Sequence, residues 1–150
     1  MIRDDIKAAE VAAMKSGDKA GTQALRMILS QVKNRDIEAR TGKATADDDA
    51  LVTEVLQRMI KQRRESADLY RKGGREELAA TEDAEIAVIA RFLPAQLDEA
   101  AAGAAIAAII AETGAAGMKD MGRVMALVKE RHASSIDPAR ASALVRAALI

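Results

Sequence analysis

The sequence contains no cysteine, no tryptophan, one tyrosine and one phenylalanine among its 150 residues. Without cysteine it forms no disulfide and offers no thiolate nucleophile or thiolate metal ligand. Because Tyr70 and Phe92 are the only aromatic residues, alanine, leucine, isoleucine and methionine must fill most of the interior. These side chains favour helices over strands. The scarcity of aromatic rings also argues against binding of single-stranded nucleic acid, in which bases stack on aromatic side chains.

Long apolar runs are also missing. The longest, residues 104–111, is far shorter than the roughly 20 residues that cross a membrane. The charged start, Met1–Lys7, lacks the apolar core of a signal peptide. We therefore expect a cytoplasmic protein without membrane contact. Lys and Arg number 23, as do Asp and Glu, and this balance argues against a protein that coats nucleic acid with its whole surface.

Apolar residues recur at helical spacing along the whole chain and predict an all-α fold. No strand-like alternation is present. Pro94 disfavours a helical residue before it and so marks a boundary between two parts. We expect an N-terminal helical bundle of about four helices over residues 1–93. A smaller three-helix subdomain is expected over residues 96–150.

The ends of several helices are marked by residues that favour such positions. Asp18, Asp98 and Asp137 each precede a helical segment and are expected to cap it. Thr45 stands three residues before Asp48, a weak form of the capping box that would open the third helix. Residues 73–74, both glycine, stop that helix, because glycine readily takes the left-handed conformation at a helix end. The helix after Pro94 is expected to end near residue 112, and the next one to run over 118–132.

No catalytic constellation is recognisable. The one histidine, His132, stands near a helix C-terminus, and the sequence suggests neither a nucleophile nor an orienting partner for it. Asp47, Asp48 and Asp49 could hold a hard cation, but acids are also favourable at a helix N-terminus without a metal. Successive residues moreover point in different directions. We predict no catalytic residue, no metal and no cofactor.

Basic residues concentrate in the third predicted helix, where seven bases and two acids lie between Arg58 and Arg75. A projection at about 100° per residue places the following bases opposite the apolar arc or at its borders: Arg58, Lys61, Arg64, Arg71 and Lys72. All of these except Arg58 are candidates for binding nucleic acid. An ordinary solvated face gives this pattern, and so does a ridge that binds phosphates. Lys119 and Arg123, four residues apart, share a face that either RNA or solvent would meet.

Arg63 differs from these bases, because it projects into the apolar arc between Met59 and Tyr70. A guanidinium there needs a partner, since an unpaired buried charge is strongly destabilising. The fourth predicted helix offers Glu82 and Glu85 on its apolar side. We predict an ion pair of Arg63 with Glu85 or Glu82 that fixes the register of the two helices.

Six short segments carry a resemblance to a known family. They are Lys61–Ser66, Gly74–Ala79, Glu85–Ile86, Phe92–Leu97, Glu112–Gly114 and Met118–Met125. In this order, and over essentially the whole chain, they resemble the YqeY family. That family is similar to the C-terminal tail of GatB, a subunit of the glutamine-dependent amidotransferase. This enzyme converts mischarged Glu-tRNA or Asp-tRNA to Gln-tRNA or Asn-tRNA.

The resemblance implies a non-catalytic binding module directed to tRNA or another structured RNA. In the amidotransferase the tail contacts the tRNA body, while phosphorylation and amide transfer belong to a separate domain. The family label of carbon–nitrogen ligase with glutamine as amido donor would thus describe the complex. Recognition would use RNA shape and phosphates, without reading DNA sequence.

Two other interpretations remain open. One is a protein–protein adaptor for an amidotransferase or an aminoacyl-tRNA synthetase, with the helical tail as its docking surface. The other is an accessory amidotransferase subunit that is active only in the complex. Phosphate binding weakens steeply with salt and an apolar interface does not, so salt dependence separates RNA binding from the adaptor role.

Overall fold

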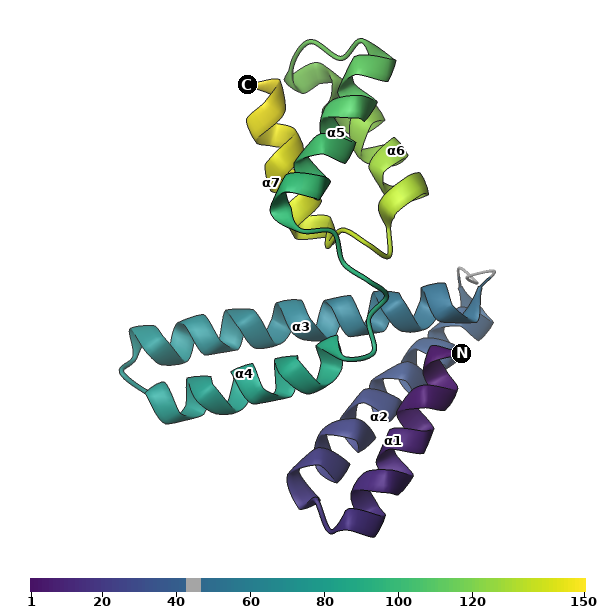
Figure 1. The fold of residues 1–150 in the computed structure, drawn as a ribbon, viewed down its shortest axis with the longest axis vertical. Coiled ribbons are helices and arrows are strands. Elements are labelled where there is room, and N and C mark those ends of the chain that lie inside the picture. Colours follow the sequence, from purple (N-terminus) through teal and green to yellow (C-terminus); the bar gives the residue numbers. More distant parts are fainter. Residues whose placement is uncertain (43–46) are drawn as a thin grey trace. The chain divides into compact units, whose positions relative to one another are not determined.

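The computed structural model describes residues 1–42 and 47–150, which form seven α-helices, one short 3-10 helix and no strand. The predicted all-α fold is therefore confirmed. The chain divides into two compact units, Met1–Leu93 and Pro94–Ile150 (Figure 1). Each unit buries its own cluster of apolar side chains, and each is described separately below.

The first unit consists of two helical hairpins. Its helices are α1 (Ile2–Ser16), α2 (Lys19–Thr41), α3 (Asp48–Lys72) and α4 (Glu76–Ala90). Helix α1 packs beside α2, and α3 packs beside α4 (Figure 1). The core is contributed by all four helices and is richest in the first half of α3. Its buried members are Ile6, Leu25, Ile28, Val32, Leu51, Val52, Val55, Leu56, Met59, Ile60 and Ile89.

The outer part of the α3–α4 hairpin, which we define as residues 61–85, lies beyond this core. Its only buried residues are two alanines, Ala67 on α3 and Ala79 on α4, which are 2% and 0% exposed. Tyr70 is half-buried nearby in the sequence, whereas Leu69 is exposed. Small side chains at the seam let two helices approach closely but bury little apolar area. The outer hairpin therefore depends more on polar contacts than the inner part does.

The predicted aspartate caps are confirmed. The carboxylates of Asp18, Asp98 and Asp137 each accept a hydrogen bond from a backbone N–H in the first turn of the following helix. Thr45 lies outside the described residues. The N-cap of α3 is Asp47, whose carboxylate accepts from the N–H of Ala50 at 3.2 Å.

The turn between α3 and α4 contains the predicted glycine pair. Gly73 is the C-cap of α3, and Gly74 has a φ of 72°, in the left-handed region that glycine adopts without strain. This turn reverses the chain so that α4 returns along α3.

The second unit contains α5 (Glu99–Thr113), the 3-10 helix η1 (Met118–Asp120), α6 (Met121–His132) and α7 (Pro138–Leu149). The predicted helix over 118–132 therefore begins with a 3-10 turn. Because a 3-10 helix has three residues per turn, Met118 leaves the register of α6 and is 45% exposed. Val124 and Val128 of α6 are buried in the core of this unit.

The residues that precede α5 form hydrogen bonds with later parts of the second unit. The N–H of Leu97 donates to the carbonyl of Ser135 at 2.9 Å, and the Gln96 amide donates to the carbonyl of Ser134 at 2.6 Å. The guanidinium of Arg140, on α7, donates to the Leu97 carbonyl. These bonds hold the residues before α5 against the α6–α7 turn.

Candidate functional site

The predicted phosphate-binding residues of α3 lie together on one side of the helix. By helical projection they lie between the surface of α3 that contacts α4 and the surface that faces solvent. They span about 16 Å along the helix axis. All are exposed. We call this surface the α3 stripe and define it as Lys61, Arg64, Arg71 and Lys72. One acid, Asp68, lies within it by the same projection.

Arg71 is a member of the stripe that contacts α4. Its Nη2 forms an ion pair with the carboxylate of Asp83, and its Nε lies 3.3 Å from Oε1 of Glu76. These interactions, the Asp83 hydrogen bond first, raise the already high pKa of Arg71. All three side chains are substantially exposed, at 41% for Arg71, 49% for Asp83 and 72% for Glu76. Two carboxylates thus already balance the charge of Arg71.

The two lysines of the stripe differ from Arg71 in their contacts. Neither Lys61 nor Lys72 forms an ion pair with any residue that the structure describes. Their ammonium groups are in solvent, where a phosphate can approach them. Lys61 and Lys72 are therefore the most available cations of the stripe.

Arg63 lies on the other side of the α3–α4 seam. Its Nη1 is 2.9 Å from Oε2 of Glu85 and 3.5 Å from Oε2 of Glu82, so the structure brings all three residues together. The Arg63 side chain is only 20% exposed, and its Nε is buried without a hydrogen bond. This group joins α3 to α4 just beyond the apolar core and is not presented to a phosphate.

Lys119 and Arg123 are exposed at the start of the α6 segment, one in η1 and one in α6. Asp120 lies between them in the sequence, and its Oδ1 is 3.3 Å from Nη2 of Arg123. The N–H of Ala116 donates to the same carboxylate at 3.0 Å and, with the nearby positive charges, lowers its pKa. Gly122, beside them, is exposed, and nothing lies within 4 Å of the position that a side chain would take there. No neighbouring helix therefore packs closely against it. The two bases thus share one local acid.

An ion-pair cluster at the N-terminus of α1 was not predicted from the sequence. The guanidinium of Arg3 donates to both carboxylate oxygens of Asp36 at 2.8 and 2.9 Å, and to those of Asp48 at 2.7 and 3.2 Å. It therefore joins α1, α2 and α3. The hydrogen bond from Arg3 is the main cause of a lowered pKa at Asp36.

The acidic run before α3 is used by the fold, each aspartate in a different way. Asp47 caps α3, Asp48 binds Arg3, and Asp49 accepts from the N–H of Ile2 at 3.0 Å. Arg3, the partner of both Asp36 and Asp48, lies 33 and 45 positions before them in the sequence. These separations are not helical spacings, so no sequence pattern predicts the contacts.

The charges of each unit are balanced. The six Lys and Arg residues in 94–150 are matched by six Asp and Glu residues, and the remaining part of the chain has 17 of each. Some of this balance is made of direct contacts, as between Arg131 of α6 and Glu112 of α5, at 2.6 and 2.8 Å. Neither unit therefore carries a net formal charge, and basic surfaces such as the α3 stripe are local.

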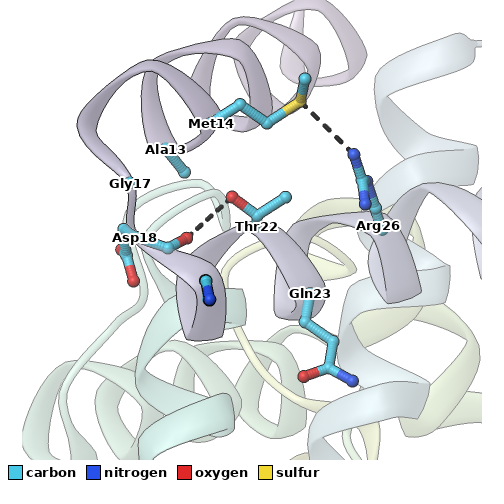
Figure 2. A pocket seen from close by; sticks show the side chains of 8 residues that line it. Ala13, Met14, Gly17, Asp18, Thr22, Gln23 and Arg26 are labelled. Atoms are coloured by element: carbon cyan, nitrogen blue, oxygen red, sulfur yellow. Dashed lines mark hydrogen bonds between the residues drawn. The ribbon is translucent and has the colours of Figure 1, made fainter.

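An open hollow of about 490 Å³ lies at the turn between α1 and α2. Figure 2 shows contacts of Asp18 with Thr22 and of Met14 with Arg26 among the residues that line it. The Thr22 hydroxyl donates to the Asp18 carbonyl at 2.7 Å, and the Arg26 guanidinium lies 3.6 Å from the sulfur of Met14. The Thr22 hydroxyl and the Arg26 guanidinium thus contact neighbours within the α1–α2 hairpin.

The described residues contain no group of three or more histidine, aspartate or glutamate side chains placed to hold a metal ion. In residues 1–42 and 47–150, no helix is by itself long and apolar enough to span a membrane. Only Glu99–Thr113 and Met118–His132 taken together, with a bend of 95°, have the required length and composition.

Comparison with known proteins places this geometry in context. The family model described as "Yqey-like protein" matches residues 3–149. The chain is also similar to Altered inheritance of mitochondria protein 41, mitochondrial, from Vanderwaltozyma polyspora, with 33% identity over 81 residues. That alignment covers 54% of this chain and 42% of the relative, so the chain spans less than half of the relative's length.

Proposed function

This chain belongs to the YqeY family, and we propose that it is a non-catalytic helical module that binds tRNA or another structured RNA. The observation that carries the proposal is the α3 stripe, in which exposed bases follow one side of a helix and both lysines lack an ion-pair partner among the described residues. Such a row of cations suits the phosphates of a folded RNA. The resemblance to the GatB tail supports tRNA as the target.

The stripe would recognise phosphate positions and RNA shape. Lys61 and Lys72 would make the first contacts, because neither forms an ion pair with a carboxylate of the described residues. The family's carbon–nitrogen ligase label would then describe the complex that such a module serves. The cytoplasmic location remains a prediction from the sequence.

A second candidate function is that of an adaptor for an amidotransferase or an aminoacyl-tRNA synthetase. It is favoured by exposed uncharged surface in both units. Leu69 on α3 is 68% exposed. Helix α5 has no charged residue from Ala100 to Ala111, and several of its alanines face solvent. A surface of this kind suits a protein helix better than a phosphate backbone.

The test is a titration of the full-length protein into labelled bulk tRNA at about 50 mM and about 200 mM salt, over which phosphate contacts weaken strongly. A Lys61→Ala/Lys72→Ala variant is expected to bind roughly tenfold more weakly at the lower salt, with a shallower salt dependence. The matched control is Lys15→Ala/Lys33→Ala, which removes the same charge from exposed positions on α1 and α2. Lys119→Ala/Arg123→Ala tests the second basic pair in the same assay.

Equal weakening by the control would show that binding follows total charge and does not use the α3 stripe. An absence of binding at the lower salt would overturn the RNA proposal. The adaptor function would then lead, and a partner interaction that is insensitive to salt would support it.

A further inference from the structure

The two helices of the outer hairpin carry opposite charge. Between Arg58 and Lys72, α3 has six bases and two acids, whereas α4 has five acids and no base between Glu76 and Ala90. The two helices pack side by side along their length (Figure 1). A row of carboxylates therefore lies next to the surface that is proposed to bind phosphates.

The acids of α4 contact α3 on both sides of the seam, with different consequences. Glu82 and Glu85 bind Arg63, which is largely shielded and lies away from the stripe. Asp83 and Glu76 bind Arg71, which belongs to the stripe and is 41% exposed. The first contact joins the helices, whereas the second occupies a cation that a phosphate can also reach.

We propose that α4 acts as an internal competitor for polyanions, in which the carboxylates of Asp83 and Glu76 compete with a phosphate for Arg71. This inference rests on the proposed RNA-binding function. Exposed ion pairs of this kind contribute little to folding, so a phosphate can displace them. The contact therefore lowers affinity for weakly charged targets without closing the site, and it favours RNAs that present several phosphates to the stripe at once.

The chain offers a matched control for this idea. Glu77 follows Glu76 on α4, is exposed, and forms no ion pair with the described residues. Glu77→Gln and Asp83→Asn each remove one negative charge from α4. Only Asp83→Asn releases Arg71 from its hydrogen-bonded carboxylate.

The experiment measures the affinity of full-length wild type, Asp83→Asn and Glu77→Gln for bulk tRNA over a range of salt concentrations. Asp83→Asn is expected to gain one phosphate contact, so its plot of log affinity against log salt steepens by about 0.7–0.9. At about 50 mM salt it should bind roughly threefold more tightly than Glu77→Gln. Arg71→Ala in the Asp83→Asn background should abolish the gain. Glu76→Gln removes the other carboxylate that contacts Arg71.

The outcomes separate this inference from the proposed function. If wild type binds and Asp83→Asn behaves as Glu77→Gln does, the competitor is overturned while RNA binding stands. A gain that survives Arg71→Ala also overturns it, because the released cation would then play no part. If no variant binds at low salt, the RNA-binding function fails and the competitor fails with it. Binding by Asp83→Asn alone would support the competitor in its strongest form.

Discussion

Arg3 binds two carboxylates that belong to different helices, Asp36 of α2 and Asp48 of α3. The side chains of all three residues are partly shielded, at 23%, 30% and 31% exposed. Paired, two-bond contacts of arginine with carboxylate are stronger than ordinary surface ion pairs. The cluster therefore holds α1 against the helices that contribute most of the core of the first unit.

We expect Asp36→Asn to lower the free energy of unfolding by about 1–2 kcal/mol at neutral pH, the range of charged hydrogen bonds discounted for partial exposure. Arg3 lowers the pKa of Asp36 in the folded state. The stabilisation is therefore present above the unfolded-state pKa of about 3.9 and is lost as pH falls through the lower folded value. The difference between wild type and variant should shrink in strong acid.

Urea unfolding at neutral and acidic pH measures this difference. Glu38→Gln is the control, because Glu38 is an exposed acid on the same helix with no ion pair among the described residues. An equal loss of stability in both variants would show that the Arg3 contact contributes nothing specific.

At the scale of elements, the inner and outer parts of the α3–α4 hairpin are held together by different contacts. Its inner part buries leucine, isoleucine and methionine, while its outer part buries only Ala67 and Ala79 and is joined by the ion pairs of Arg63. The outer hairpin should therefore open more readily than the inner part, since it buries less apolar area.

We expect Ala79→Leu to destabilise the outer hairpin by about 1–3 kcal/mol, because the alanine seam leaves no room for a larger side chain. Ala80→Leu adds the same atoms at an exposed position of α4 and should have little effect. Amide hydrogen exchange of residues 61–85, compared with the inner part of α3, measures the change. Faster exchange confined to these residues is the expected result, whereas unchanged exchange in Ala79→Leu would show that the seam tolerates the side chain.

Local features of the elements could be predicted from the sequence. The aspartate caps depend on the residue itself and its next turn, and the helical projections place Arg63 and its glutamates at one seam. The 3-10 turn at Met118 could not be predicted from the sequence. The glycine before it and the spacing of the apolar residues after it fit a continuous α-helix equally well. The contacts of Arg3 with Asp36, and of Arg71 with Asp83, depend on how separate helices pack, which no local spacing records.

At the scale of the whole molecule, the two units have separate cores. Val32 is 1% exposed in the first, and Val145 is 0% exposed in the second. Both cores are built almost entirely from aliphatic side chains, whose contribution to stability follows the apolar area they bury.

We expect Val32→Ala and Val145→Ala each to cost about 2 kcal/mol, and each only in its own unit, because a cavity weakens the cluster that surrounds it. Hydrogen exchange resolved by residue reports both units in one experiment. Faster exchange in residues 1–42 and 47–93 is expected for Val32→Ala, and in 94–150 for Val145→Ala. If either variant accelerated exchange equally in both units, the two cores would form one cooperative system.

The position of Tyr70 has a consequence for how this protein can be observed. It is the only tyrosine in a chain without tryptophan, and residues 94–150 contain no phenylalanine, tyrosine or tryptophan. Its half-buried ring lies in the outer α3–α4 hairpin. Tyrosine fluorescence of the unlabelled protein therefore comes from this hairpin. The second unit contributes no tyrosine or tryptophan fluorescence. The hairpin that carries the α3 stripe thus contains its own reporter, whose emission can follow a bound polyanion without an added dye.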